Sequence, residues 1–102
     1  MAGKSGKPAA GEAEQRVQLP EDCRMTALSG VRTELLAVLA HPVCTLDATA
    51  VARVDTAAIQ LLVAFQRAAG AAGRTVRWQG VGAPLREAAA LLGLEQTLQL
   101  PA

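Results

Sequence analysis

The sequence predicts an α/β domain with a mixed sheet of about four to five strands and with helices on one face of that sheet. Two observations support this fold class. Residues 43–79 read as a strand, a helix and a second strand, and a helix of this length between two strands is typical of a parallel crossover. Within 75–79, Val76 and Trp78 alternate with polar residues, which indicates a strand that is covered on one face only.

Composition limits the function classes. The chain has 102 residues, enough for one domain, and 51% of them are hydrophobic, so a core can form. Ten Lys and Arg residues balance nine Asp and Glu residues, whereas a nucleic-acid binder needs a basic surface. Phe65 and Trp78 are the only aromatic residues, too few for a platform that stacks bases. We therefore expect no nucleic-acid partner.

The N-terminal segment differs in composition from the rest. Residues 1–15 are small, charged or polar and show no apolar periodicity, which predicts a disordered tail followed by a domain over 16–102. The chain contains neither a leader-type apolar segment nor a run long enough to cross a membrane, which predicts a cytoplasmic protein without membrane insertion. Cys23 and Cys44 lack the spacing of metal ligands, and we expect reduced thiols and no cofactor or metal.

The first elements are a short strand and a helix. Val17 and Leu19 flank Gln18 as in a strand that Pro20 ends or that lies at an edge, and residues 21–25 fit a turn followed by a second short strand. Residues 26–40 place apolar side chains at helical spacing, and the residue before a proline leaves the helical region, so the helix stops at His41-Pro42.

The crossover and a last helix follow. We predict a strand over 43–48, a helix over 56–69, a glycine-rich turn over 70–73 and a strand over 75–79. Pro84 opens a third helix, which Gly93 and Leu94 end in a Schellman motif. The buried stripe of this helix is predicted to be Leu85, Ala88, Ala89 and Leu92. Leu98 and Leu100 fit either a final short strand or an apolar tail that docks on the core.

The helix after residue 55 is more apolar than a one-sided helix requires. Residues 58–65 are interrupted by a single polar residue, Gln60, whereas an amphipathic helix needs an apolar stripe of about 100°. Two explanations remain open. Neighbouring helices bury both flanks, or part of the surface is reserved for another protein.

The junction before this helix is the main candidate site. Asp55 suits the N-cap position, and Thr56 is then the first helical residue, beside N–H groups that favour a phosphate or a carboxylate. The alternative is an ordinary cap that only starts a helix. Asp47 and Asp55 can converge at the carboxyl end of the strand, but without a His, Lys or metal partner they make no catalytic site. We predict that the protein is not an enzyme.

The junction also carries a family resemblance. Residues 46–58, Leu-Asp-Ala-Thr-Ala-Val-Ala-Arg-Val-Asp-Thr-Ala-Ala, resemble the signature of STAS domains, the fold of bacterial anti-sigma-factor antagonists. Residues 76–80 and 91–94 fall where that family has its next strand and the end of its last long helix, so the resemblance spans about 16–101. Val54-Asp55-Thr56 and Gln79-Gly80-Val81 are similar to the small STAS subunits of bacterial lipid-asymmetry ABC transporters.

The resemblance implies roles for individual residues. Thr56 matches the first hydroxyl position after the signature aspartate. Ala57 stands where sporulation-type antagonists carry their phosphorylated serine, and Ala58 replaces the following glycine. The resemblance therefore leaves two roles for Thr56: the remaining phosphoacceptor, or a contact residue like the threonine of the transporter subunits. The predicted partner-binding or phosphorylation residues are Asp55, Thr56, Ala57, Ala58 and Gln60, with Asp47 in support.

The function implied by the resemblance is regulation by protein–protein binding, as in an anti-sigma-factor antagonist, with a switch at Thr56. The partner is then an anti-sigma factor or a kinase. Two alternatives are a STAS subunit that binds the ATPase of a phospholipid-transport ABC complex and an adaptor that binds a chemosensory signalling component. A homodimer is also left open.

Overall fold

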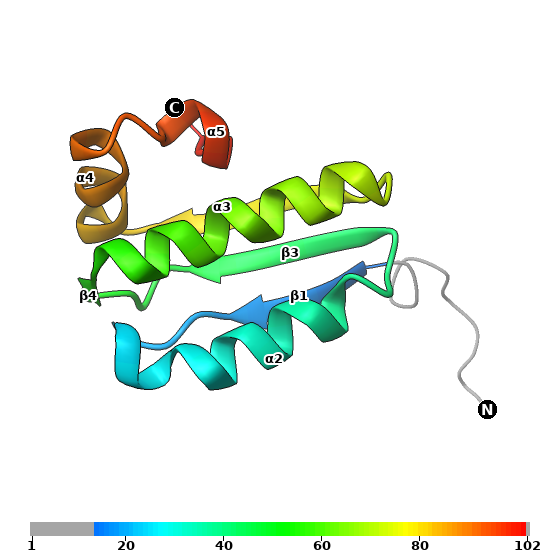
Figure 1. Ribbon diagram of the computed structural model, residues 1–102, viewed down its shortest axis with the longest axis horizontal. Coiled ribbons are helices and arrows are strands. Elements are labelled where there is room, and N and C mark those ends of the chain that lie inside the picture. The colour runs from blue at the N-terminus through cyan, green and yellow to red at the C-terminus, as the bar shows by residue number, and fades with distance from the viewer. Residues whose placement is uncertain (1–13, 102) are drawn as a thin grey trace.

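The computed structural model describes residues 14–101, which form strands and helices in alternation (Figure 1). The elements in chain order are β1 (Glu14–Gln18), β2 (Asp22–Cys23), the 3-10 turn η1 (Met25–Ala27), α2 (Leu28–Val38), β3 (Val43–Ala48), β4 (Arg53–Val54), α3 (Thr56–Ala71), β5 (Thr75–Val81), α4 (Ala83–Leu91) and α5 (Glu95–Leu98). The first strand begins at Glu14, two residues before the expected start of order. The rest of the predicted tail, 1–13, lies outside the described residues.

The strands form two sheets. The larger has the order β1-β3-β5, the smaller pairs β2 with β4, and every pairing among the described residues is parallel. The predicted α/β class is confirmed, whereas the predicted single mixed sheet is replaced by two parallel ones. The reason is connectivity, because α2 and α3 each return the chain to the end of the sheet where the preceding strand began.

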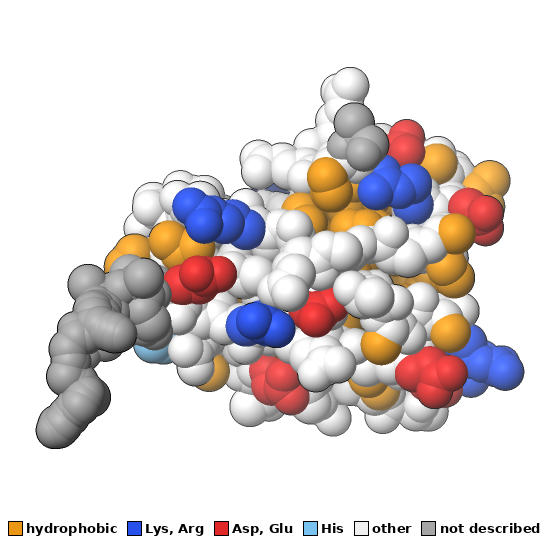
Figure 2. Space-filling view, turned by 180° about the vertical axis from the view of Figure 1, so that it is seen from behind, with side chains coloured by type: hydrophobic (Ala, Val, Ile, Leu, Met, Phe, Trp, Pro, Cys, Tyr) orange, Lys and Arg blue, Asp and Glu red, His pale blue; other side chains and the backbone are white. Residues whose placement is uncertain are grey.

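Helices α2 and α3 cover one face of the three-stranded sheet, as predicted (Figure 1). Figure 1 shows α2 and α3 on the same side of β1 and β3. Cys44, Leu46 and Ala48 of β3 are completely buried on that side. The opposite face, seen from behind in Figure 2, is largely polar with scattered charges of both signs. Thr45 belongs to this open face by alternation, yet it is buried, and its hydroxyl donates to Glu14 Oε2 at 2.5 Å.

The apolar surplus of α3 is mostly buried by its neighbours. Its core residues are Ala58, Ile59, Leu62, Val63, Phe65 and Ala69. Leu61 is half-buried, and Ala64 is exposed at a shallow apolar hollow between α2 and α3, where Leu36 is also exposed. The first of the two explanations therefore accounts for most of this helix.

The end of α4 has the predicted Schellman motif. Gly93 has a φ of +70°, its N–H donates to Ala90 O at 3.0 Å, and the N–H of Leu94 donates to Ala89 O at 2.9 Å. Leu94 packs against the core from this position. The motif turns the chain back toward the sheet.

The C-terminal segment docks on the core, which was one of the two expectations, but it does not form the short strand that was the other. Leu98 ends the short helix α5 instead of lying in a strand, and its side chain is completely buried. Its carbonyl accepts from Trp78 Nε1 at 2.8 Å and from Gln66 Nε2 at 2.6 Å. Trp78 is half-buried, because β5 is an edge strand and this segment covers the ring from one side. No helix within 14–101 is long and apolar enough to cross a membrane.

Candidate functional site

Asp55 caps α3, as predicted, and also fixes a second segment. It is extended (φ −120°, ψ 177°), and its Oδ1 accepts from the N–H of Ala58 at 2.9 Å. Its Oδ2 accepts from the N–H of Met25, 30 residues earlier in the chain, also at 2.9 Å. One carboxylate therefore joins the start of α3 to the start of η1. The bond to Met25 could not be predicted from the residues that neighbour Asp55 in the sequence.

The other predicted residues fall into accessible and inaccessible positions. Thr56 is exposed at the first position of α3, and Gln60 is exposed one turn later. Ala57 is half-buried. Ala58 is 1% exposed and belongs to the core, so it supports the helix from below and presents no surface to a partner. The small residue at 58 is explained by packing.

Asp47 and Asp55 accept hydrogen bonds from different groups. Asp47 is half-buried at the end of β3, and its Oδ1 accepts from the N–H of Thr49 at 3.0 Å. This bond, with the nearby charge of Arg16 adding to it, lowers the pKa of Asp47. Asp47 and Asp55 have no hydrogen-bond partner in common, so the structure does not join them into one polar centre. Asp47 stabilises the turn that follows β3.

An apolar notch lies beside Thr56, between the start of α3 and the side of α4. It encloses about 260 Å³. Its lining residues are Val54, Asp55, Thr56, Ile59, Ala88, Leu91 and Leu92. Leu91 is 88% exposed and Leu92 is 44% exposed. We call this surface the Thr56 notch.

A second hollow of about 400 Å³ continues the Thr56 notch around α4. The two share Val54, Ala88 and Leu91, and the second adds Arg53 and Glu87 at its rim. Met25, whose N–H is held by Asp55, is 70% exposed. Exposed apolar side chains that gather around polar ones are typical of a protein-binding surface.

Leu92 was predicted to be buried with the inner side of α4, but it is exposed. Leu85 and Ala89 are buried and Ala88 is half-buried, as expected, but Leu92 lies at the helix end and faces the notch. Sequence reasoning also missed Leu91. Consecutive residues of a helix point about 100° apart, so two adjacent leucines both face the core only where the helix is covered over a wide face, as α3 is. On the short helix α4, the adjacent pair was the available signal for an exposed leucine.

Gly80 explains how α4 reaches this position. Leu46 pairs with Trp78 and Ala48 pairs with Val81, so β5 carries one extra residue in a bulge. Gly80 lies in the bulge with a φ of +80°, and a Cβ there would collide with the Thr49 hydroxyl. The bulge bends the end of β5 and directs the chain into α4, which then packs beside β4 and α3.

Other chemistry-bearing side chains do not gather. Within 14–101, no group of three or more His, Cys, Asp and Glu residues is arranged to hold a metal ion. Cys23 and Cys44 are free and buried in the core, and burial raises the pKa of both thiols. The ion pair of Asp22 with Arg24, 2.7 Å long, lies on the surface, and the hydrogen bond from Arg24 lowers the pKa of Asp22.

The comparisons with known proteins agree with the resemblance seen in the sequence. A family model described as "Mlab, STAS domain" matches residues 7–101. The chain belongs to the STAS domain family. STAS domains are in general non-enzymatic domains that bind other proteins.

A solved structure shows the same fold. The crystal structure of a sulfate transporter family protein from Wolinella succinogenes aligns with a TM-score of 0.69 over 96% of this chain and 79% of that chain, at 20% identity. At this identity the likeness establishes the STAS fold alone. No curated protein matches the chain in sequence.

Proposed function

We propose that this STAS domain is a non-enzymatic, cytoplasmic regulator that binds another protein through the Thr56 notch. The observation that carries the proposal is the exposure of Leu91 and Leu92 directly beside Thr56. A single exposed leucine is ordinary, but two that line one hollow with the half-buried Val54 form a continuous apolar contact surface above the core residue Ile59.

The proposed switch is phosphorylation of Thr56, as in an anti-sigma-factor antagonist. Thr56 is exposed at the first position of a 16-residue helix, where the N-terminal N–H groups favour an added negative charge. Folding therefore tolerates a phosphate. A partner that covers the notch does not, because an unpaired charge in a desolvated contact costs several kcal/mol. An anti-sigma factor or its kinase fits this role.

A second candidate partner is the ATPase of a phospholipid-transport ABC complex. The description of the matching family names Mlab, and Val54-Asp55-Thr56 and Gln79-Gly80-Val81 resemble the small STAS subunits of such transporters. In that case the hydroxyl of Thr56 is a contact group. A component of a chemosensory system is a third candidate for the same surface.

The first experiment captures binding partners from the native host and identifies them by mass spectrometry. It shows whether the partner is an anti-sigma factor or kinase, a transporter ATPase or a chemosensory component. Affinity for that partner is then measured with Thr56→Glu and Thr56→Ala, beside melting temperatures. We expect Thr56→Glu to fold with a stability change of at most about 1 kcal/mol and to lose binding at least about tenfold. Thr56→Ala loses a hydroxyl contact worth about 1 kcal/mol.

The matched control is Thr33→Glu, because Thr33 is also an exposed helical threonine but lies on α2 and lines neither hollow. It should leave the affinity unchanged. Full affinity of Thr56→Glu would place the binding site elsewhere and would leave Asp55 as an ordinary helix cap.

A further inference from the structure

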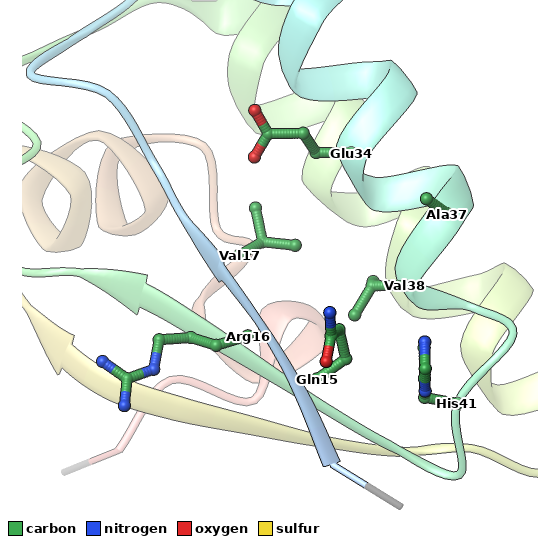
Figure 3. A pocket seen from close by; sticks show the side chains of 7 residues that line it. All are labelled: Gln15, Arg16, Val17, Glu34, Ala37, Val38 and His41. Carbon is green, nitrogen blue, oxygen red and sulfur yellow. The ribbon is translucent and has the colours of Figure 1, made fainter. Parts of the chain in front are cut away.

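The outer edge of β1 is not paired with any other described strand. β1 pairs with β3 on one side, and no other described strand pairs with it, so its outer N–H and C=O groups can accept a further strand. A hollow of about 180 Å³ runs along this edge, between β1 and α2 (Figure 3). Glu34 and Ala37 of α2 line it opposite Gln15 and Val17. The hollow gives room for side chains of an added strand.

We propose that two copies of this chain pair through their β1 edges, antiparallel and around a twofold axis, into one continuous six-stranded sheet. This goes beyond the function proposed at Thr56. The notch lies where β4, α3 and α4 meet, whereas β1 lies at the opposite edge of the sheet from β5 (Figure 1). Each surface can therefore be tested without the other.

The two faces of β1 restrict the register of such a pair. Gln15 and Val17 lie on the side of the hollow and α2, and Figure 3 shows Arg16 pointing away from α2. By strand alternation, Glu14 shares the open face with Arg16. Residues directly opposite in an antiparallel pair share a face, so a twofold axis must pass through a residue pair such as Gln15–Gln15, Arg16–Arg16 or Val17–Val17.

The charges of Glu14 and Arg16 favour one of these three registers. Centring on Gln15 places Glu14 of each copy opposite Arg16 of the other, which makes two cross-strand pairs of opposite charge. Centring on Arg16 places two arginines face to face, and centring on Val17 places Arg16 opposite the neutral Gln18. The strand is thus self-complementary in one register, as a twofold interface requires.

The Glu14 carboxylate is already oriented for this contact. Its Oε2 accepts from the hydroxyl of Thr45 at 2.5 Å, so the side chain is held on the open face beside its own strand. Less rotamer freedom is then lost when a guanidinium approaches. The net charge of +1 adds little long-range repulsion between two copies.

The test is sedimentation velocity of the full chain over a range of concentrations. We expect a concentration-dependent dimer that added salt weakens. Glu14→Arg and Arg16→Glu, each alone, replace both attractive pairs with repulsive ones and should weaken dimerisation about tenfold or more. An equimolar mixture of the two variants should form a heterodimer, because the edge that carries two arginines then faces the edge that carries two glutamates.

Two controls separate the edge contact from other causes. Arg77→Glu changes an arginine in the same cross-strand row as Arg16 and Thr45, but on β5, and should dimerise like the wild type. Circular-dichroism melting checks that the Glu14→Arg variant folds without its bond to Thr45. A monomeric wild type, single variants that dimerise normally, a mixture that stays monomeric, or an equal loss in Arg77→Glu would each overturn the proposal.

Discussion

At the scale of single residues, Asp55 connects the local structure to the candidate site. Its two carboxylate oxygens hold the N–H of Ala58 within α3 and the N–H of Met25 at η1, so it fixes the helix start that presents Thr56. The bond to Ala58 follows from cap chemistry, which depends on neighbours along the chain. The bond to Met25 needs η1 to reach α3, and this depends on the pairing of β2 with β4.

Replacing Asp55 by Ala should destabilise the domain by about 1–2 kcal/mol, because the helix cap is lost together with the acceptor for Met25. Urea denaturation measures the loss. Asp55→Asn keeps one oxygen acceptor and should fall between the wild type and Asp55→Ala. Equal stability of Asp55→Ala and the wild type would mean that water replaces both bonds without cost.

At the scale of elements, the two sides of α4 have different roles: one side packs in the core, and the other is exposed at the Thr56 notch. The inner side buries Leu85 at 1% exposure, whereas Leu91, less than two turns later, is 88% exposed. The two leucines share a side-chain type and a helix, and they differ in what covers them. They therefore form a matched pair for testing the role of the Thr56 notch.

Leu85→Ala should destabilise the domain by about 2–5 kcal/mol, because it leaves a cavity in the core. Leu91→Ser should change stability by no more than about 0.5 kcal/mol, as is usual for a surface position. The same Leu91 change should weaken binding of the captured partner, since it removes apolar contact area. Normal partner affinity of a folded Leu91→Ser variant would remove α4 from the proposed surface.

At the scale of the whole molecule, two buried thiols make the free energy of unfolding decrease at alkaline pH. Burial raises the pKa of Cys23 and of Cys44, so the folded chain holds these protons more tightly than the unfolded chain does. Their contribution is complete below the unfolded thiol pKa of about 8.5 and is lost as the pH rises toward the folded values. The chain contains no Tyr to titrate in the same range.

The midpoint of urea unfolding should therefore fall as the pH rises from about 8 to about 10. A Cys23→Ala, Cys44→Ala double variant is less stable at neutral pH, because it loses core volume, but its alkaline slope should be smaller. Iodoacetamide should modify the folded wild type more slowly than the urea-unfolded chain. An identical alkaline slope in both proteins would assign the pH dependence to other groups.

The elements that depend on local rules were predictable, and those that depend on distant partners were not. The bounds of β3 and the start of α3 agree with the pattern of residues, and so does the glycine turn after α4. Of the two alternatives for the C-terminal segment, the strand is replaced by α5 and the docking on the core holds, because the carbonyl of Leu98 accepts from Trp78 and Gln66, which lie far from it in sequence. The exposure of Leu92 likewise depends on where the bulge at Gly80 directs α4.

The sequence by itself determined the α/β class, the Asp55 cap and the position of Thr56 at the first turn of α3, because periodicity, capping and turn chemistry act between residues close in the chain. The tertiary structure alone decided that β2 and β4 form a second sheet and that Leu91 and Leu92 line a notch beside Thr56. These features arise where separate elements meet, and burial at such a contact depends on the shape of both sides.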